Sequence, residues 1–328
     1  MPNLPITLAC GRYERTAALL DGRVAPQGVD LTCLALPPYE MFWRQIRHRE
    51  FDVSELSLSA HIVATARGER DLLGIPVFPS RVFRHSSIFI RDNAGIHDPS
   101  DLVGRRVGVP EYHMTAALYV RGLLSDEYGV DASSIHWIQA GMTQPGRKER
   151  VELSLPDGLV LEPREHETLL DLLVAGEIDA LIAPSVPRRL MEAPGVRRLF
   201  IDPRAAERAS FERTGIFPIM HLVAITATLH ERAPWVAQEV AKAFGEAKAI
   251  ALREAFESGA ISSSLPWYQL ELEETRRLMG EDLWPYGVEG NRPTLEAAVR
   301  YAAEQGLIER PLPIEELFVA NCLGVPVR

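Results

Sequence analysis

Three histidines lie in polar segments beside predicted strands, where their side chains could carry protons in a reaction. They are His85, His113 and His221, and Glu111 stands two residues before the second of them. An imidazole ionises with a pKa of about 6.5, so it can accept or donate a proton near neutral pH, and a nearby carboxyl group could serve as a second acid. We therefore expect these four residues to be the general acid–base groups, although each could instead be a buried structural residue.

A basic stretch and several hydroxyl groups indicate an anionic ligand. Residues 81–87 read RVFRHSS, and the guanidinium groups of Arg81 and Arg84 match the geometry of a carboxylate. Arg12 and Arg15 follow the first predicted strand, where a second anion contact is expected. Solvated surface charge is the alternative interpretation of both segments. The predicted substrate contacts are Arg12, Arg15, Ser57, Arg81, Arg84, Ser86 and Thr115.

The sequence contains no motif for a familiar cofactor site. Residues 141–148, GMTQPGRK, approach the pattern of a phosphate-binding loop but lack its lysine followed by serine or threonine. The three cysteines are too widely spaced for a disulfide framework or a metal cluster. We therefore predict no cofactor and no metal, while a divalent metal bound jointly by His85, His113 and His221 stays open.

Composition and charge exclude several classes of protein. The chain has 328 residues, of which 46% are hydrophobic and 24% charged, as in a globular enzyme or binding protein and unlike a disordered chain or a coiled coil. Its net charge of −10 at pH 7 argues against nucleic acid as a partner, because such binding needs a basic face. No apolar stretch is long enough to span a bilayer, and the first residues lack a secretory signal, so we expect a cytoplasmic protein with no membrane partner. A homodimer is the generic expectation for such an enzyme.

Short β-rich runs that alternate with helical patterns predict an α/β architecture with mixed, mainly parallel sheets. Apolar residues at helical spacing mark the helices, and β-branched runs bounded by turn residues mark the strands. Strands are expected within 6–10, 29–34, 51–57, 74–78, 86–90, 101–109, 135–139, 176–182 and 222–225, and helices within 39–46, 115–124, 169–173, 236–247 and 294–306.

The order of these elements indicates two lobes. We expect lobe 1 to begin with residues 1–105, lobe 2 to be inserted as 106–216, and the chain to return to lobe 1 over 217–328 with C-terminal helices. The polar residues 141–166 are expected to form a surface excursion such as a hairpin. Ligands of open α/β sheets bind outside the carboxyl ends of strands. A central cleft is therefore expected beside the segments 11–15, 54–57, 79–87, 110–115 and 217–221.

Five stretches of the chain, taken together, resemble one known family. They are CGRYERTAALLDGRVAPQGVDLT, FWRQIRHREFDVSELSLS, GIPVFPSRVFRHSSIFIR, DLVGRRVGVPEYHMTAALYVRGLLSDEYGV and GIFPIMHLVAI. They resemble the 4,5-dihydroxyphthalate decarboxylases over most of residues 6–255, and YGVEGNRPTLEAAVRYAAEQGL near the C-terminus is also typical of that family. The resemblance implies a two-lobed fold similar to type II periplasmic binding proteins, a role in cytoplasmic aromatic degradation, and conversion of 4,5-dihydroxyphthalate to protocatechuate and CO2.

The implied substrate is a small aromatic dicarboxylate in which each carboxylate lies para to a hydroxyl. Removing the phenolic proton pushes electrons toward the carbon that bears the carboxylate, and protonation of that carbon then releases CO2. The ring is its own electron sink, so this route needs no organic cofactor. We expect one of the three histidines to take the phenolic proton and another acid, Glu111 among the candidates, to protonate the carbon. An arginine should hold the carboxylate that stays.

Three other functions stay open from the sequence. A non-catalytic solute-binding protein of the same fold would bind an aromatic or other carboxylate, although its exported versions need a leader or a lipid-anchor cysteine that this sequence does not show. Another cytoplasmic enzyme of this fold could act on a different carboxylated ring. A metal-dependent decarboxylase would use the histidines as ligands.

Overall fold

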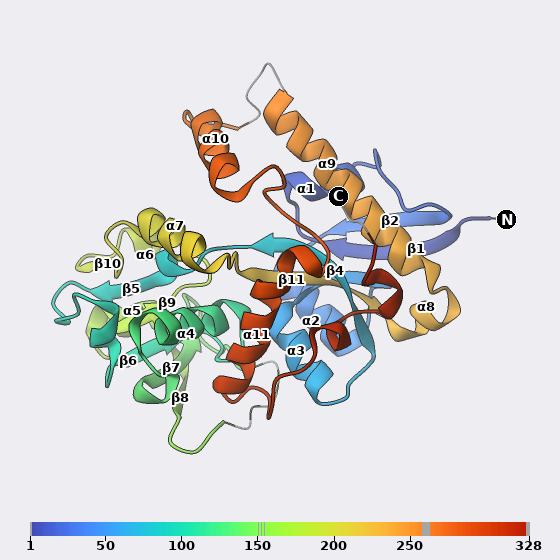
Figure 1. Cartoon of the computed structure of the whole chain (residues 1–328). Helices are drawn as coiled ribbons and strands as arrows, with labels where there is room; N and C mark the ends of the chain where they lie inside the picture. The colour runs from blue at the N-terminus through green and yellow to red at the C-terminus, as the bar shows by residue number, and fades with distance from the viewer. Residues whose placement is uncertain (1, 150, 152, 154, 258–262, 326–328) are drawn as a thin grey trace. The chain divides into compact units, whose positions relative to one another are not determined.

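The computed structural model describes residues 2–149, 151, 153, 155–257 and 263–325 (Figure 1). The chain divides into two compact units, each built from segments that are distant in the sequence. Unit 1 comprises Met1–Arg81, His221–Leu295 and Pro313–Arg328, and unit 2 comprises Val82–Met220 and Glu296–Leu312. Residues 82–105, which the sequence pattern assigns to the first lobe, lie in unit 2 because their strand pairs within the second sheet.

Unit 1 contains a five-stranded sheet with the order β2-β1-β3-β11-β4. Strand β1 runs parallel to β2 and β3, whereas β11 runs antiparallel to β3. Most of β11 belongs to the segment His221–Leu295 of unit 1. A late part of the chain therefore supplies a strand that lies between β3 and β4. The strands are β1 (Leu4–Cys10), β2 (Val29–Ala35), β3 (Val53–Ser57), β4 (Leu72–Arg81) and β11 (Ile219–Thr226).

Helices α1, α2, α3 and α9 contact strands of this sheet, and distant parts of the chain pack together. The long helix α9, orange in Figure 1, contacts the N-terminal helix α1 and strand β4. Helix α2 buries Met41 and Phe42 against Ala9 and Phe51, which forms a local core beside β1. The helices are α1 (Glu14–Leu20), α2 (Pro38–His48), α3 (Leu58–Ala66), α8 (Ala227–Arg232), α9 (Trp235–Glu257) and α10 (Tyr268–Met279), with short 3-10 turns η4 (Glu289–Asn291), η5 (Ile314–Leu317) and η6 (Ala320–Cys322).

Unit 2 contains a six-stranded sheet with the order β10-β5-β9-β6-β7-β8. The pairs β6–β9, β6–β7 and β7–β8 are parallel, whereas β5 is antiparallel to both β9 and β10. The strands are β5 (Ile88–Arg91), β6 (Arg106–Val109), β7 (His136–Gly141), β8 (Val160–Thr168), β9 (Ala180–Ile182) and β10 (Val196–Arg198).

The core of unit 2 is centred on a short helix whose ends are encoded locally. The side chain of Thr168 caps α5 by accepting a hydrogen bond from the Asp171 N–H, and Gly176 ends the helix with a φ of 81°. Leu169 and Leu173 of α5 are fully buried with residues of β5, β7 and β9. The helices of the unit are α4 (Thr115–Tyr128), α5 (Leu169–Ala175), α6 (Arg188–Met191) and α7 (Pro203–Thr214), with η1 (His85–Ser87), η2 (Pro99–Leu102) and η3 (Ala132–Ser134); α11 (Arg292–Glu304) begins in unit 1 and continues in unit 2.

The predicted α/β class with mixed sheets is confirmed, and parallel pairs outnumber antiparallel ones among the strand pairs given above. Three local predictions are wrong. Strand β4 continues to Arg81, so residues 79–81 are not part of a loop, and Ser86 lies in η1 rather than in a strand. The described residues of 141–166 do not form the predicted hairpin, because β8 pairs in parallel with β7. Within the described residues no helix is long and apolar enough to cross a membrane.

Candidate functional site

An imidazole and a carboxylate meet on the central strands of unit 1. His221 lies opposite Ser57 in the β11–β3 register, and Glu55 stands two positions along β3 on the same face. Diagonal neighbours of this kind are within reach of long side chains. The Nδ1 atom of His221 lies 2.5 Å from Oε1 of Glu55. The Phe42 ring and the His221 imidazole form a T-shaped pair with a centroid distance of 4.8 Å.

The Glu55 carboxylate is fully buried and accepts hydrogen bonds from two further donors. The backbone N–H of Gly11, just after β1, donates to Oε2 at 2.7 Å, and the hydroxyl of Tyr13 donates to Oε1 at 2.8 Å. Burial favours the protonated acid, but the hydrogen bond and charge of His221 together with these two donors outweigh it and hold the pKa of Glu55 below its usual value. The pair is therefore an ionised carboxylate in contact with an imidazole.

Arginine and aromatic side chains surround this cluster. The Arg15 guanidinium lies 4.4 Å from the centre of the Tyr13 ring and 3.8 Å from that of Trp284, and its Nε donates to the Pro79 carbonyl at 2.6 Å. Burial lowers the pKa of Arg15, whereas burial and the charge of Glu55 raise the pKa of Tyr13. Arg15 is thus fixed between two rings, and Tyr13 stays a neutral hydrogen-bond donor.

The other predicted contacts of unit 1 differ in how accessible they are. Arg12 is exposed next to Gly11, and no hydrogen bond or ion pair links its side chain to another described residue. Ser57 is buried and caps α3. Arg81 is buried at the end of β4, where it donates to the Pro285 carbonyl at 2.8 Å and to Asn291. Of the three predicted arginines of unit 1, Arg12 is the one whose side chain is exposed.

A second histidine is enclosed by carboxylates within unit 2. His113 is fully buried, with Nδ1 in contact with Glu149 and Nε2 at 3.4 Å from a Glu111 oxygen. The opposite oxygen of Glu111 accepts a hydrogen bond from Arg147 at 2.6 Å. The positive charge of Arg147 beside Glu111 favours the carboxylate form of this acid. Thr115 is buried close by as the first residue of α4, whose N-cap residue Met114 offers no side-chain cap.

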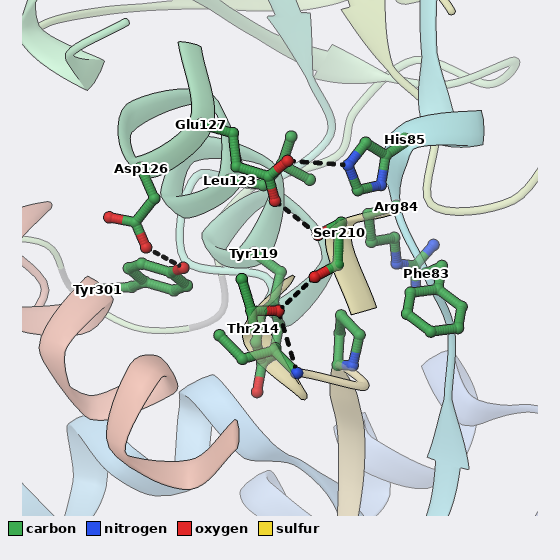
Figure 2. A pocket seen from close by; sticks show the side chains of 12 residues that line it. Phe83, Arg84, His85, Tyr119, Leu123, Asp126, Glu127, Ser210, Thr214 and Tyr301 are labelled. Carbon is green, nitrogen blue, oxygen red and sulfur yellow. Dashed lines mark hydrogen bonds and ion pairs between the residues drawn. The ribbon is translucent and has the colours of Figure 1, made fainter. Parts of the chain in front are cut away.

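The third histidine lines a small pocket of unit 2, which Figure 2 shows from close by. Nε2 of His85 lies 3.8 Å from Glu127, and neither ring nitrogen has a hydrogen-bond partner among the described residues. Ser210 and Arg213 both donate to the same carboxylate, at 2.5 Å each. The other lining residues include Tyr119 and Tyr301. The pocket holds the predicted His85 and Arg84 but lies wholly in unit 2, so the Glu55–His221 pair is not part of it.

Arg84 is buried, and its direct partners are neutral. Its guanidinium contacts the Met220 sulfur, the Pro184 carbonyl at 3.1 Å and the Ser87 hydroxyl at 3.4 Å. Burial lowers the pKa of Arg84 to about 10. The predicted basic segment is therefore not a solvated loop: Arg81 and Arg84 are both buried, and Ser86 donates through its N–H and hydroxyl to Glu207, at 3.0 and 2.9 Å. A carboxylate beside Arg84 would supply the charge that its neutral partners do not.

Among the described residues, no group of three or more His, Cys, Asp or Glu side chains could hold a metal ion. Cys10 and Cys322 are buried free thiols, and burial raises the pKa of both.

The sequence predicted Glu111, which lies 3.4 Å from His113, but not the carboxylates Glu55, Glu149 and Glu127 that also contact the three histidines. Glu55 and Tyr13 lie inside strand-end segments that the sequence selects, but neither was singled out. The signal for Glu55 is its position in β3, VSELS, where alternation places a carboxylate on a face that must be buried. Glu149 and Glu127 give no such signal, because a long loop and a helix bring them to His113 and His85.

Comparison with curated proteins gives two close relatives. A 4,5-dihydroxyphthalate decarboxylase of Comamonas testosteroni is 41% identical over 320 residues, which is 97% of this chain and 97% of that protein. A protein of the same name from Pseudomonas putida is 42% identical over 208 residues, which is 63% of this chain and 81% of that protein. No protein-family model matches the chain.

Solved structures share the fold at low sequence identity. The periplasmic aliphatic sulphonate binding protein of Escherichia coli is 15% identical with a TM-score of 0.53, and the match covers 96% of this chain and 92% of that one. The alkanesulfonate-binding protein of Xanthomonas axonopodis pv. citri, solved with MOPS, is 12% identical with a TM-score of 0.51 over 97% of this chain and 98% of that one. A Candida albicans protein described as having the generic periplasmic binding protein fold gives a TM-score of 0.52 at 12% identity, over 92% of this chain and 91% of that one. The predicted periplasmic-binding-protein fold is therefore confirmed.

Proposed function

The chain belongs to the 4,5-dihydroxyphthalate decarboxylase family, and from that premise we propose that it converts 4,5-dihydroxyphthalate to protocatechuate and CO2. The observation that carries this proposal is the 41% identity to the Comamonas testosteroni enzyme, which extends over 97% of both chains. The ionised Glu55 beside His221 supports it, because an imidazole backed by a carboxylate can take up a proton from a phenol.

The proposed reaction replaces one carboxylate of the ring with a proton. Loss of the phenolic proton leaves its electron pair on the oxygen, and the para carbon takes a proton from an acid. The C–C bond to the carboxylate then breaks, CO2 leaves, and the ring regains aromaticity as a phenolate. The phenolate recovers its proton from the base, so the net reaction consumes one proton from solution.

We assign the base of this scheme to His221. Of the three predicted histidines, its side chain is 16% exposed, whereas those of His85 and His113 are 4% and 0% exposed. His85 and His113 remain candidates for the acid that protonates the carbon. Glu111 is a weaker candidate for that acid, because its ion pair with Arg147 favours the carboxylate.

The test of this function is a direct assay of the purified protein. Incubation with 4,5-dihydroxyphthalate is expected to give protocatechuate, which chromatography detects. One CO2 should be released for each molecule of substrate consumed. We propose that no metal or organic cofactor takes part, so activity should survive dialysis against a chelator. Binding of the substrate without turnover would refute the decarboxylase and favour a carboxylate-binding protein. Loss of activity on dialysis, with recovery on adding a divalent metal, would refute the metal-free route.

We expect Arg12 to hold the carboxylate that the product retains. A guanidinium in contact with a carboxylate contributes about 1.5–3 kcal/mol, so Arg12→Ala should raise KM by about 10–100-fold. Unfolding by urea should be nearly unchanged, because the Arg12 side chain is exposed and forms no hydrogen bond or ion pair with a described residue. The matched control is Arg253→Ala, which removes an exposed arginine of α9 in the same unit. Equal KM values for the two variants would show that Arg12 does not bind the substrate.

The remaining features of the proposal concern partner and compartment. A small aromatic dicarboxylate is the proposed ligand, and the proposed site of action is the cytoplasm, where fractionation of cells should recover the activity. A homodimer is the proposed assembly, and sedimentation of the purified chain measures it directly.

A further inference from the structure

Glu55 makes contacts that restrict the protonation of His221. Three donors converge on its two oxygens: the Gly11 N–H on Oε2, and the Tyr13 hydroxyl and His221 Nδ1 on Oε1. An ionised carboxylate can only accept hydrogen bonds. Because the Tyr13 hydroxyl and the Gly11 N–H are donors in this arrangement, a short contact between Nδ1 and Oε1 requires a hydrogen on Nδ1.

A hydrogen on Nδ1 determines the state of the other ring nitrogen. In neutral imidazole one nitrogen carries the hydrogen and the other carries a lone pair. His221 must then be the Nδ1–H tautomer, with its lone pair on Nε2. No described residue forms a hydrogen bond with Nε2, and the side chain is 16% exposed, so this nitrogen is open to a ligand.

We propose that Glu55 is a positioning residue of the decarboxylation, which keeps Nδ1 of His221 protonated so that Nε2 exchanges a proton with the phenol of the substrate. The inference rests on the proposed function. In the step, the phenolic O–H bond breaks, an N–H bond forms at Nε2, and the electron pair stays on the phenolate oxygen. Glu55 takes no proton, and its charge stabilises the imidazolium until the proton returns to the product.

The first test measures the tautomer of His221 in the wild-type protein and needs no variant. Nitrogen-15 NMR of protein labelled on histidine, assigned by comparison with His221→Gln, distinguishes a protonated ring nitrogen from one with a lone pair. At a pH where His221 is neutral, we expect a protonated Nδ1 and an unprotonated Nε2. A lone pair on Nδ1 would overturn the proposal whatever the activity of the protein.

The second test uses Glu55→Gln, whose amide keeps the shape of the side chain. The amide can donate to Nδ1, so the variant should shift His221 toward the Nε2–H tautomer. We expect kcat for 4,5-dihydroxyphthalate to fall by about 10²-fold or more, with little change in KM, because the contact acts on the proton transfer and not on binding. Unchanged kcat, or a rise in KM alone, would overturn the positioning role.

A matched control separates this effect from damage to the sheet. Asp52 precedes β3 and accepts hydrogen bonds from the Thr7 N–H at 2.8 Å and the Thr7 hydroxyl at 3.0 Å. Asp52→Asn makes the same acid-to-amide change in the same β1–β3 pair, away from His221, and should leave kcat and the His221 tautomer unchanged. An equal loss of kcat in both variants would mean that Glu55 is only structural.

The two tests distinguish failure of this inference from failure of the function. A wild-type protein that does not consume 4,5-dihydroxyphthalate refutes the decarboxylase, and the positioning role in that reaction falls with it, even if the NMR spectrum shows the expected tautomer. A wild-type protein that turns over, with Glu55→Gln equally active, refutes the positioning role and leaves the function in place.

Discussion

Replacing His221 by Gln is expected to lower kcat for 4,5-dihydroxyphthalate by about 10²–10⁴-fold, which is the usual contribution of a general base. The amide of Gln can still donate to Glu55, so the buried carboxylate keeps a partner and the fold should persist. Gln has no lone pair on nitrogen that can take a phenolic proton near neutral pH. The measurement is steady-state kinetics of protocatechuate formation, with the unfolding midpoint in urea recorded for each variant.

The matched control for this variant is His230→Gln. His230 lies on α8 in the same unit, outside the Glu55 cluster, and its replacement should leave kcat unchanged. Single Gln variants of His85 and His113 extend the comparison to the other predicted histidines. Full turnover in His221→Gln would remove this residue from the mechanism, and full turnover in all three variants would refute histidine catalysis altogether.

The folding stability of the protein is expected to fall by about 3 kcal/mol between pH 6.5 and pH 4 because of His61 alone. Burial lowers the pKa of this histidine from 6.5 to about 4, and its Nε2 lies 2.7 Å from the Leu317 carbonyl, where a neutral ring donates. The unfolded chain takes up a proton as the pH falls through 6.5, whereas the folded protein does so only near pH 4. The stabilisation is therefore complete above pH 6.5 and is lost as the pH falls toward 4, at about 1.36 kcal/mol for each pH unit.

Urea unfolding at pH 7 and pH 4.5 measures this dependence on pH. His61→Gln keeps a donor for the Leu317 carbonyl but cannot ionise, so its stability should vary less between the two pH values than that of the wild type. His48→Gln, at the exposed end of α2, is the control and should retain the full dependence. An equal loss of unfolding free energy between pH 7 and pH 4.5 in the wild type and in His61→Gln would show that His61 does not cause the dependence on pH.

Much of the fold could be predicted because local patterns determine it. The strands β1, β2 and β7 and the helix α5 follow from β-branched runs, apolar periodicity and end signals such as Thr168 and Gly176. The extent of β4 could not be predicted, because Pro79 interrupts the pattern of a strand that tertiary pairing extends to Arg81. The parallel pairing of β8 depends on its neighbour β7 and not on its own residues.

The candidate site was predicted less completely than the fold. The rule that ligands lie at strand ends selects the segments that hold Glu55, Tyr13 and His221, but no local pattern indicates that these side chains meet. Their contacts join residues up to 166 positions apart, and the pairing of β3 with both β1 and β11 creates them. The burial of Arg84 was missed for the same reason, since Met220 and Pro184 come from distant parts of the chain.

The position of β11 has a consequence for synthesis on the ribosome. All strands of the unit 2 sheet lie between Ile88 and Arg198, so that sheet can pair as soon as this stretch has emerged. The unit 1 sheet cannot be complete until the chain has been synthesised through Thr226, where β11 ends. Until then the edges of β3 and β4 that pair with β11 stay unpaired. The nascent chain should therefore complete the sheet of unit 2 before the sheet of unit 1, although unit 2 itself still needs residues 296–312, and a chaperone that shields exposed strand edges should bind the chain until His221 reaches Glu55.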